Sequence, residues 1–187
     1  STDVSKVIRR DGYGANGTYL TLVQQAAKQW KVWQEQLGEP IYFQTGKLVI
    51  YPDFHPGTRG YDIWSFLGGW GPPIELLTAE EARRRFPQII YLDDDICVYD
   101  PWAGYVATGQ AVKGLAKLAK DSGVIVKEKT RVNHIDEKNS GALIVLDEHQ
   151  VVFDRLVIAA GPWLGRLVPD INNALRVSRH NLALIKP

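Results

Sequence analysis

The sequence has one cysteine, no methionine and almost no net charge. Because Cys97 is alone, a disulfide framework and a cysteine-rich metal site are excluded, and a reducing compartment is expected, either the cytoplasm or an organellar matrix. The 22 Lys and Arg residues nearly balance the 21 Asp and Glu residues, which leaves a formal net charge of +1. We therefore expect neither nucleic acid nor a membrane as a partner.

Long apolar runs and metal-binding motifs are lacking as well. No apolar stretch approaches the length of a membrane span, and the N-terminal residues lack the apolar core of a secretory signal. None of the four histidines has a partner at metal-ligand spacing, so no metal is predicted. The run of aspartates at residues 93–95 lacks the alternating spacing of a calcium loop and predicts a solvated turn.

Helical and strand patterns are both present, which predicts an α+β fold. Apolar residues recur at helical spacing over residues 18–37, and Gly38 ends that pattern. Residues 41–51 read as a strand in which Gly46 marks a bulge or a close approach. Thr78 and Glu81 form a capping box for a helix over residues 79–85.

The second half of the chain alternates in the same way. Thr108 is expected to cap a helix that ends at Ser122-Gly123, and a hairpin is expected around residues 148–149. Two short strands around a turn are predicted within residues 95–107, and further strands at residues 124–127, 130–137, 142–147, 151–153, 157–160 and 175–186. The run at 157–160 is wholly apolar, as in a strand that is covered on both faces.

That apolar strand leads into an elbow of small residues, Ala159, Ala160 and Gly161, followed by Pro162 and Trp163. Small side chains let a backbone approach a large ligand, and proline suits the first turn of a helix. A helix starting there would offer free N–H groups to a phosphate. A tight strand-to-helix turn without a ligand explains the same residues, so both interpretations stay open.

Six segments occur in an order that resembles the D-amino-acid-oxidase-like family of FAD-dependent oxidoreductases. The members most similar in pattern are monomeric sarcosine oxidase, N-methyltryptophan oxidase and the fructosyl-amine oxidases. The segments are SKVIR at 5–9, TGKLVIY at 45–51, LTAEEARRRFP at 77–87, DPWAGY at 100–105, TRV at 130–132 and RLVIAAGPWLG at 155–165. The resemblance implies a two-domain enzyme in which an α/β FAD-binding part is interleaved with an antiparallel-sheet substrate domain.

The glycine-rich motif G-x-G-x-x-G, which cradles the cofactor pyrophosphate in this family, is absent. We therefore expect an incomplete internal fragment of such an enzyme. The resemblance divides it into a flavin-side loop and leading segment, a substrate-domain part, an FAD-binding-domain part and a return to the substrate domain, at residues 1–14, 15–104, 105–168 and 169–187.

The activity implied by the resemblance is oxidation of the C–N bond of a secondary amine or amino acid. Hydride passes to FAD, and dioxygen is the expected acceptor. The isolated chain is expected to be inactive. The alternative is a non-catalytic binding or interaction module without flavin. An exposed interdomain surface would favour a homo-oligomer in either case.

The resemblance also assigns substrate and flavin contacts near the N-terminus. Arg9 matches the arginine that holds the substrate carboxylate, although the adjacent Arg10 leaves the register ambiguous. Ser5 and Lys6 match positions beside the flavin ring, where a lysine would stabilise negative charge.

Further along the chain, the resemblance assigns contacts to the rest of the cofactor. Val132 matches a backbone contact to the adenine, and Ala160, Gly161 and Trp163 match the phosphate and flavin side. We expect a Cβ at Gly161 to push the cofactor away.

Overall fold

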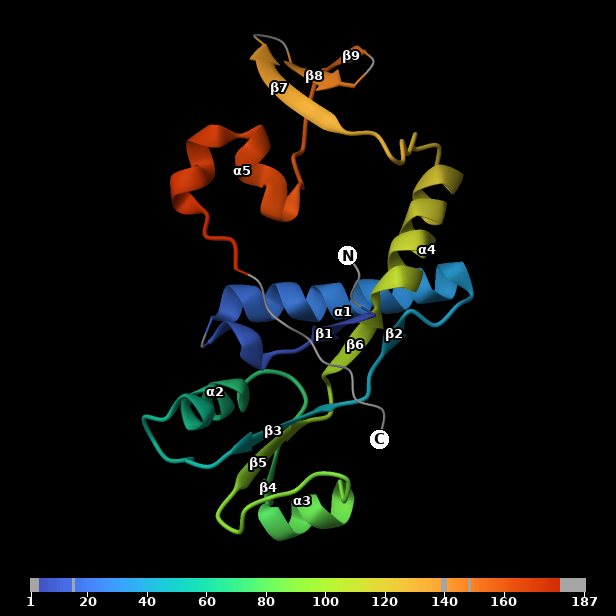
Figure 1. The fold of residues 1–187 in the computed structure, drawn as a ribbon. Coiled ribbons are helices and arrows are strands. Elements are labelled where there is room, and N and C mark those ends of the chain that lie inside the picture. The colour runs from blue at the N-terminus through green and yellow to red at the C-terminus, as the bar shows by residue number, and fades with distance from the viewer. Residues whose placement is uncertain (1–3, 15, 139–140, 148, 179–187) are drawn as a thin grey trace. The chain divides into compact units, whose positions relative to one another are not determined.

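The computed structural model describes residues 4–14, 16–138, 141–147 and 149–178. The chain forms two compact units, Ser1–Ile125 and Val126–Pro187 (Figure 1). The first unit combines helices with two antiparallel sheets, and the second has a three-stranded meander followed by short helices. The α+β class predicted from the sequence is confirmed. Among the helices of these residues, none has both the length and the apolar character needed to cross a bilayer.

Helix α1 (Gly17–Leu37) is capped at both ends. The Asn16 side chain accepts hydrogen bonds from two backbone N–H groups of the first turn, at 3.1 and 3.3 Å. Gly38 ends the helix with a φ of 66°, in the left-handed region that glycine adopts without strain. The helix predicted over residues 18–37 is confirmed.

Two three-stranded antiparallel sheets lie in the first unit. The first sheet has the order β1 (Ser5–Ile8), β6 (Gly104–Ala107), β2 (Tyr42–Phe43). The second has the order β3 (Lys47–Tyr51), β5 (Ile96–Asp100), β4 (Glu75–Thr78). The core of the first sheet consists of Ala27, Ile41, Tyr42, Val106 and Ala111, against which Trp30 and Trp33 pack.

Gly46 divides the strand predicted at residues 41–51 into β2 and β3, which belong to different sheets. Its φ is 79°, and a Cβ there would collide with the ring of Tyr99. The predicted close approach is therefore present, but a single continuous strand was the wrong expectation. The strands β5 and β6 likewise lie in different sheets. The Gly46 N–H donates to the Ala103 carbonyl at 2.8 Å, so the two segments in which the chain passes from one sheet to the other are hydrogen-bonded to each other.

The described part of the first unit also contains three shorter α-helices, α2 (Arg59–Leu67), α3 (Ala79–Arg85) and α4 (Thr108–Asp121), and a 3₁₀ helix at Asp11–Tyr13. The capping box of Thr78 and Glu81 on α3 is present as predicted. The prediction that Thr108 caps α4 was wrong, because Ala107 occupies the cap position. Strand β6 keeps its pairing with β1 up to Ala107 and the helix starts at the next residue, so Thr108 lies inside the first turn rather than at the cap position.

The buried Cys97 thiol belongs to the core of the second sheet, with Ala79, Ala82 and Tyr91. Burial, with a smaller effect from Asp95, raises the pKa of the Cys97 thiol, so the sulfur stays protonated and unreactive. Within the described ranges, no three or more His, Cys, Asp or Glu side chains are grouped to hold a metal ion.

The second unit contains the meander β7 (Val132–Lys138), β8 (Gly141–Leu146) and β9 (Gln150–Phe153). The hairpin expected between the last two strands is present, with the Leu146 N–H donating to the His149 carbonyl at 2.9 Å, although Glu148 lies outside the described residues. Helix α5 (Leu164–Leu167) follows, flanked by 3₁₀ helices at Gly161–Trp163 and Pro169–Ala174.

The strand predicted at residues 157–160 is absent, which corrects that expectation. Val157 is 89% exposed, and no described strand pairs with this segment, because β7, β8 and β9 pair only with one another. An apolar run forms a covered strand only when a neighbouring strand accepts its hydrogen bonds. Most of the final strand expected at 175–186 lies outside the described residues, and its described part is not a strand.

Candidate functional site

Strand β1 places Ser5 and Lys6 on the edge of the first sheet. They pair with Ala107 and Val106 of β6. Successive side chains of a strand point to opposite faces, so Ser5 and Lys6 cannot both face a ligand that lies on one side of the sheet. The Ser5 side chain is partly buried and the Lys6 side chain is exposed.

Arg9 follows β1 directly and lines an apolar cavity of about 260 Å³ against helix α1. The other lining residues are all uncharged: Val7, Ile8, Tyr19, Leu22, Val23 and Ala26. We call this cavity the Arg9 groove. A Cβ at Gly12 would lie 2.6 Å from the Arg9 Nε atom, so the guanidinium group lies against the Gly12 backbone. The groove therefore presents one cation beside apolar surface.

Arg10 is the opposite case, a buried arginine that is fully engaged. It is 1% exposed, and its Nε and Nη2 atoms donate to both carboxylate oxygens of Asp100, at 3.0 and 2.6 Å. Two further bonds reach the carbonyls of Trp70 (2.7 Å) and Pro72 (3.1 Å), and the guanidinium carbon lies 5.6 Å from the centre of the Trp102 ring. Such a bidentate, charge-assisted pair fixes three separate chain segments.

The two adjacent arginines thus have different environments, a difference that their sequence spacing did not reveal. The guanidinium group of Arg10 cannot pair with a ligand carboxylate, because it is buried and already paired with a carboxylate of the chain. Arg9, in contrast, is exposed and, among the described residues, forms no ion pair with a carboxylate. Of the two registers left open by the sequence, only the one that uses Arg9 offers an accessible guanidinium group.

The small-residue elbow lies in the second unit. A Cβ added at Gly161 would have no neighbour within 4 Å, and the φ of Gly161 is 53°. Among the described residues, no side chain therefore fills the space directly beside Gly161. The helix expected after the elbow is only a 3₁₀ turn followed by the four residues of α5, so the expected N-terminal helix dipole is small.

Val132 and Trp163 line one cavity of about 370 Å³ in this unit, together with Arg131, Arg166 and two further residues, Asn133 and Leu167. Val132 and Trp163 were both predicted as cofactor contacts, and the fold brings them together; Ala160 and Gly161 do not line this cavity. The two arginines were not singled out from the sequence, because their shared cavity depends on the meander and α5 lying together. Their charges suit a phosphate-bearing ligand.

The sequence as a whole matches known flavoproteins. The model of the family described as "FAD dependent oxidoreductase" matches residues 2–187. N-methyl-L-tryptophan oxidase of Yersinia pestis (strain Pestoides F) is 26% identical over 164 residues, which cover 88% of this chain and 44% of that enzyme. The chain thus spans less than half the length of the curated relatives that it matches.

Solved structures agree at the level of the fold. The open form of NikD, described as an unusual amino acid oxidase, gives a TM-score of 0.78 at 16% identity and covers 91% of this chain and 44% of its own. L-proline dehydrogenase of P. horikoshii gives 0.75 at 20% identity, with coverage of 85% and 42%. Glycine oxidase of Geobacillus kaustophilus gives 0.72 at 21% identity, with coverage of 88% and 46%.

Proposed function

Because the chain belongs to the family of FAD-dependent oxidoreductases, we propose that it forms part of an enzyme that oxidises the C–N bond of a secondary amine or amino acid. Bound FAD would supply the redox chemistry by accepting a hydride, with dioxygen as the final acceptor. The observation that carries the proposal is the Arg9 groove, in which one accessible guanidinium lies beside an otherwise uncharged lining. The chain itself supplies binding, orientation and electrostatics.

In this proposal, Arg9 binds the substrate carboxylate through two parallel hydrogen bonds. The apolar part of the substrate contacts Val7 and Leu22, which are 59% and 54% exposed and therefore available to a ligand. Lys6 lies on β1, three positions before Arg9, and would stabilise negative charge on the reduced flavin.

The cofactor contacts that we propose lie in the second unit. The residues around Val132 and Trp163 fit part of a dinucleotide, since they offer an aromatic ring and the charges of Arg131 and Arg166. A cavity of about 370 Å³ is close to the lower limit for ligand pockets, so it would hold only one portion of FAD. The open space beside Gly161 supports a close approach of the cofactor to this backbone.

Substitution of Arg9 by methionine tests the substrate contact. In a complete enzyme that joins this chain to family segments on both sides of it, including a G-x-G-x-x-G segment, we expect kcat/KM for an N-methyl amino acid to fall about 30-fold, mainly through KM, because a charge-assisted pair is lost. Peroxide release measures the rate. The decarboxylated amine serves as the control, because it has no carboxylate to lose. An equal loss for both substrates would contradict the proposed role of Arg9.

The second candidate function is a non-catalytic interaction module that self-associates, and two exposed side chains favour it. Ile125 is 85% exposed and Val157 is 89% exposed, each in a segment that belongs to no strand. Exposed apolar residues in extended segments are available for pairing with another chain. We propose a homo-oligomer that forms through these segments.

Gel filtration of the chain with excess FAD tests whether the isolated chain holds the cofactor and whether it self-associates. We expect a colourless protein, because the chain lacks the glycine-rich segment that makes most pyrophosphate contacts in the family. We also expect it to elute as an oligomer, and the Val157→Lys variant to elute as a smaller species. Co-elution of stoichiometric flavin would overturn the first expectation and favour a working cofactor site. An unchanged elution volume for the variant would overturn the second.

A further inference from the structure

Helix α1 borders a second cavity on a side away from the Arg9 groove. Four of its residues line the groove: Tyr19, Leu22, Val23 and Ala26. The residues five positions later line the second cavity: Gln24, Ala27, Lys28 and Lys31. A shift of five residues turns the helix by about 140° at 3.6 residues per turn, so the two cavities lie on different faces. The second cavity has a volume of about 260 Å³.

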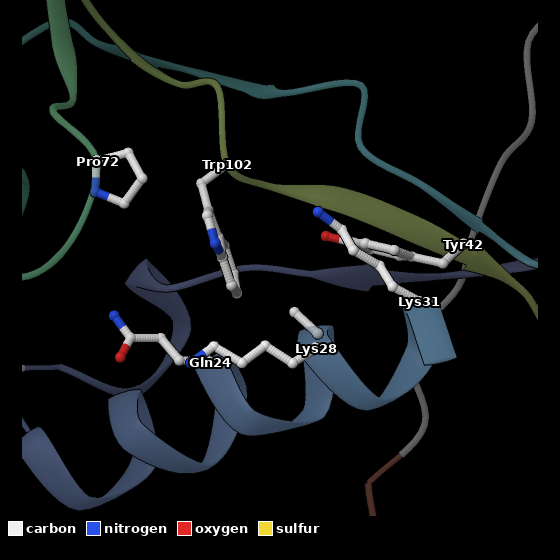
Figure 2. Close-up of a pocket in the computed structure, with 7 residues that line it drawn as sticks. Gln24, Lys28, Lys31, Tyr42, Pro72 and Trp102 are labelled. Carbon is white, nitrogen blue, oxygen red and sulfur yellow. The ribbon is translucent and has the colours of Figure 1, made fainter. Parts of the chain in front are cut away.

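The wall opposite α1 consists of Tyr42, Pro72 and Trp102, and we call the cavity the Trp102 pocket. Figure 2 shows the Trp102 side chain projecting toward α1, along which Gln24, Lys28 and Lys31 are arranged.

Buried Arg10 holds this wall in place without any ligand. Its Nη2 atom donates to the Pro72 carbonyl at 3.1 Å, and its guanidinium group lies over the Trp102 ring. Its partner Asp100 accepts the Trp102 backbone N–H at 3.0 Å. Both walls of the pocket are therefore preorganised, one by the helix and one by the ion pair, which lowers the ordering cost of binding.

The polar groups of the pocket are cationic or neutral. Within the described part of the chain, neither Lys28 nor Lys31 forms an ion pair, and no carboxylate lines the pocket. Lys31 donates one hydrogen bond to Gln44 Oε1 at 3.2 Å, which leaves two donors on its ammonium group. Burial, and to a smaller extent Asp100, raises the pKa of Tyr42, so its hydroxyl stays protonated and can donate.

We propose that the Trp102 pocket binds a small planar organic anion of the aromatic carboxylate class. Lys28 and Lys31 pair with the carboxylate, and the ring lies between the indole of Trp102 and the stems of the helix side chains. A volume of about 260 Å³ accommodates a single ring, since drug-sized ligands occupy about 300–1,000 Å³. The site is separate from the Arg9 groove, and the proposal does not depend on the redox function.

Isothermal titration of the chain with benzoate tests the proposal. We expect saturable binding at one site, with a dissociation constant about tenfold higher in the Lys28→Gln/Lys31→Gln double variant, because each lost charge-assisted hydrogen bond weakens binding. Both lysines are exposed, so the substitutions leave the core unchanged. The Lys113→Gln variant on α4 is the matched control and should bind as the parent does. Benzamide, which has the same shape without the charge, should bind about tenfold more weakly than benzoate.

Four outcomes would overturn the proposal. The first is the absence of saturable benzoate binding. The second is equal affinity for benzoate and benzamide, and the third is an unchanged affinity in the double variant. The fourth is loss of binding in Arg9→Met alone, which would place the anion in the Arg9 groove and support the substrate contact instead.

Discussion

Replacing Arg10 with methionine lowers the free energy of unfolding of the first unit by about 3–5 kcal/mol, as expected when one partner of a buried ion pair is removed. Arg10 is 1% exposed and Asp100 is 7% exposed, so the carboxylate that remains is desolvated without a counter-charge. The carbonyls of Trp70 and Pro72 lose their donor in the same variant.

Its neighbour Arg9 provides the matched control. Arg9→Met should change the free energy of unfolding by less than about 0.5 kcal/mol, because the side chain is exposed. Urea unfolding followed by tryptophan fluorescence measures both variants. Trp163 is the only tryptophan outside the first unit, so a Trp163→Phe background confines the signal to that unit. Equal losses for the two arginines would contradict the assignment of Arg10 as the buried partner.

A double variant separates the charge from the packing. Arg10→Met with Asp100→Leu removes the uncompensated carboxylate, so it should be more stable than Arg10→Met alone. If the double variant were the less stable of the two, the hydrogen bond from the Trp102 N–H to Asp100 would outweigh the cost of the unpaired carboxylate.

Local signals in the sequence sufficed for helices α1 and α3. The length of α1 follows from apolar spacing and Gly38, and the start of α3 follows from Thr78 and Glu81, because all of these contacts lie within one or two turns. The Thr108 cap failed because a non-local pairing prevailed: β1 holds β6 in the sheet until the residue before the helix.

Non-local contacts also explain what the sequence could not predict. Gly46 was correctly identified as a close approach, but the side chain it approaches, Tyr99, is distant in sequence, and so the change of sheet at Gly46 was not predictable. The choice between Arg9 and Arg10 depends in the same way on Asp100, 90 positions from Arg10. The apolar run at 157–160 was predicted to be a strand, but sequence alone cannot show whether a neighbouring strand accepts its hydrogen bonds.

Among substitutions in the strands that carry the candidate site, we expect Gly104→Ala to lower the free energy of unfolding most. A Cβ at Gly104 would overlap the backbone oxygen of Phe43 and lie 2.8 Å from the Cα atom of Gln44. Backbone atoms cannot rotate away as a side chain can, so β2 and β6 must separate. We expect a loss of about 3 kcal/mol in the free energy of unfolding, at the upper end of the cost of overpacking.

Gly109 provides the control, because a Cβ there meets nothing within 4 Å and the residue lies in helix α4. Gly109→Ala should be neutral or stabilising by up to about 1 kcal/mol, since alanine favours helix more than glycine does. Urea unfolding in the Trp163→Phe background measures both variants. Gly104 pairs with Ile8, the residue before Arg9, so a displaced β6 also shifts the end of β1. A loss of less than about 1 kcal/mol for Gly104→Ala would mean that β2 is not held against β6 as the structure shows, because overpacking of a fixed backbone costs at least that much.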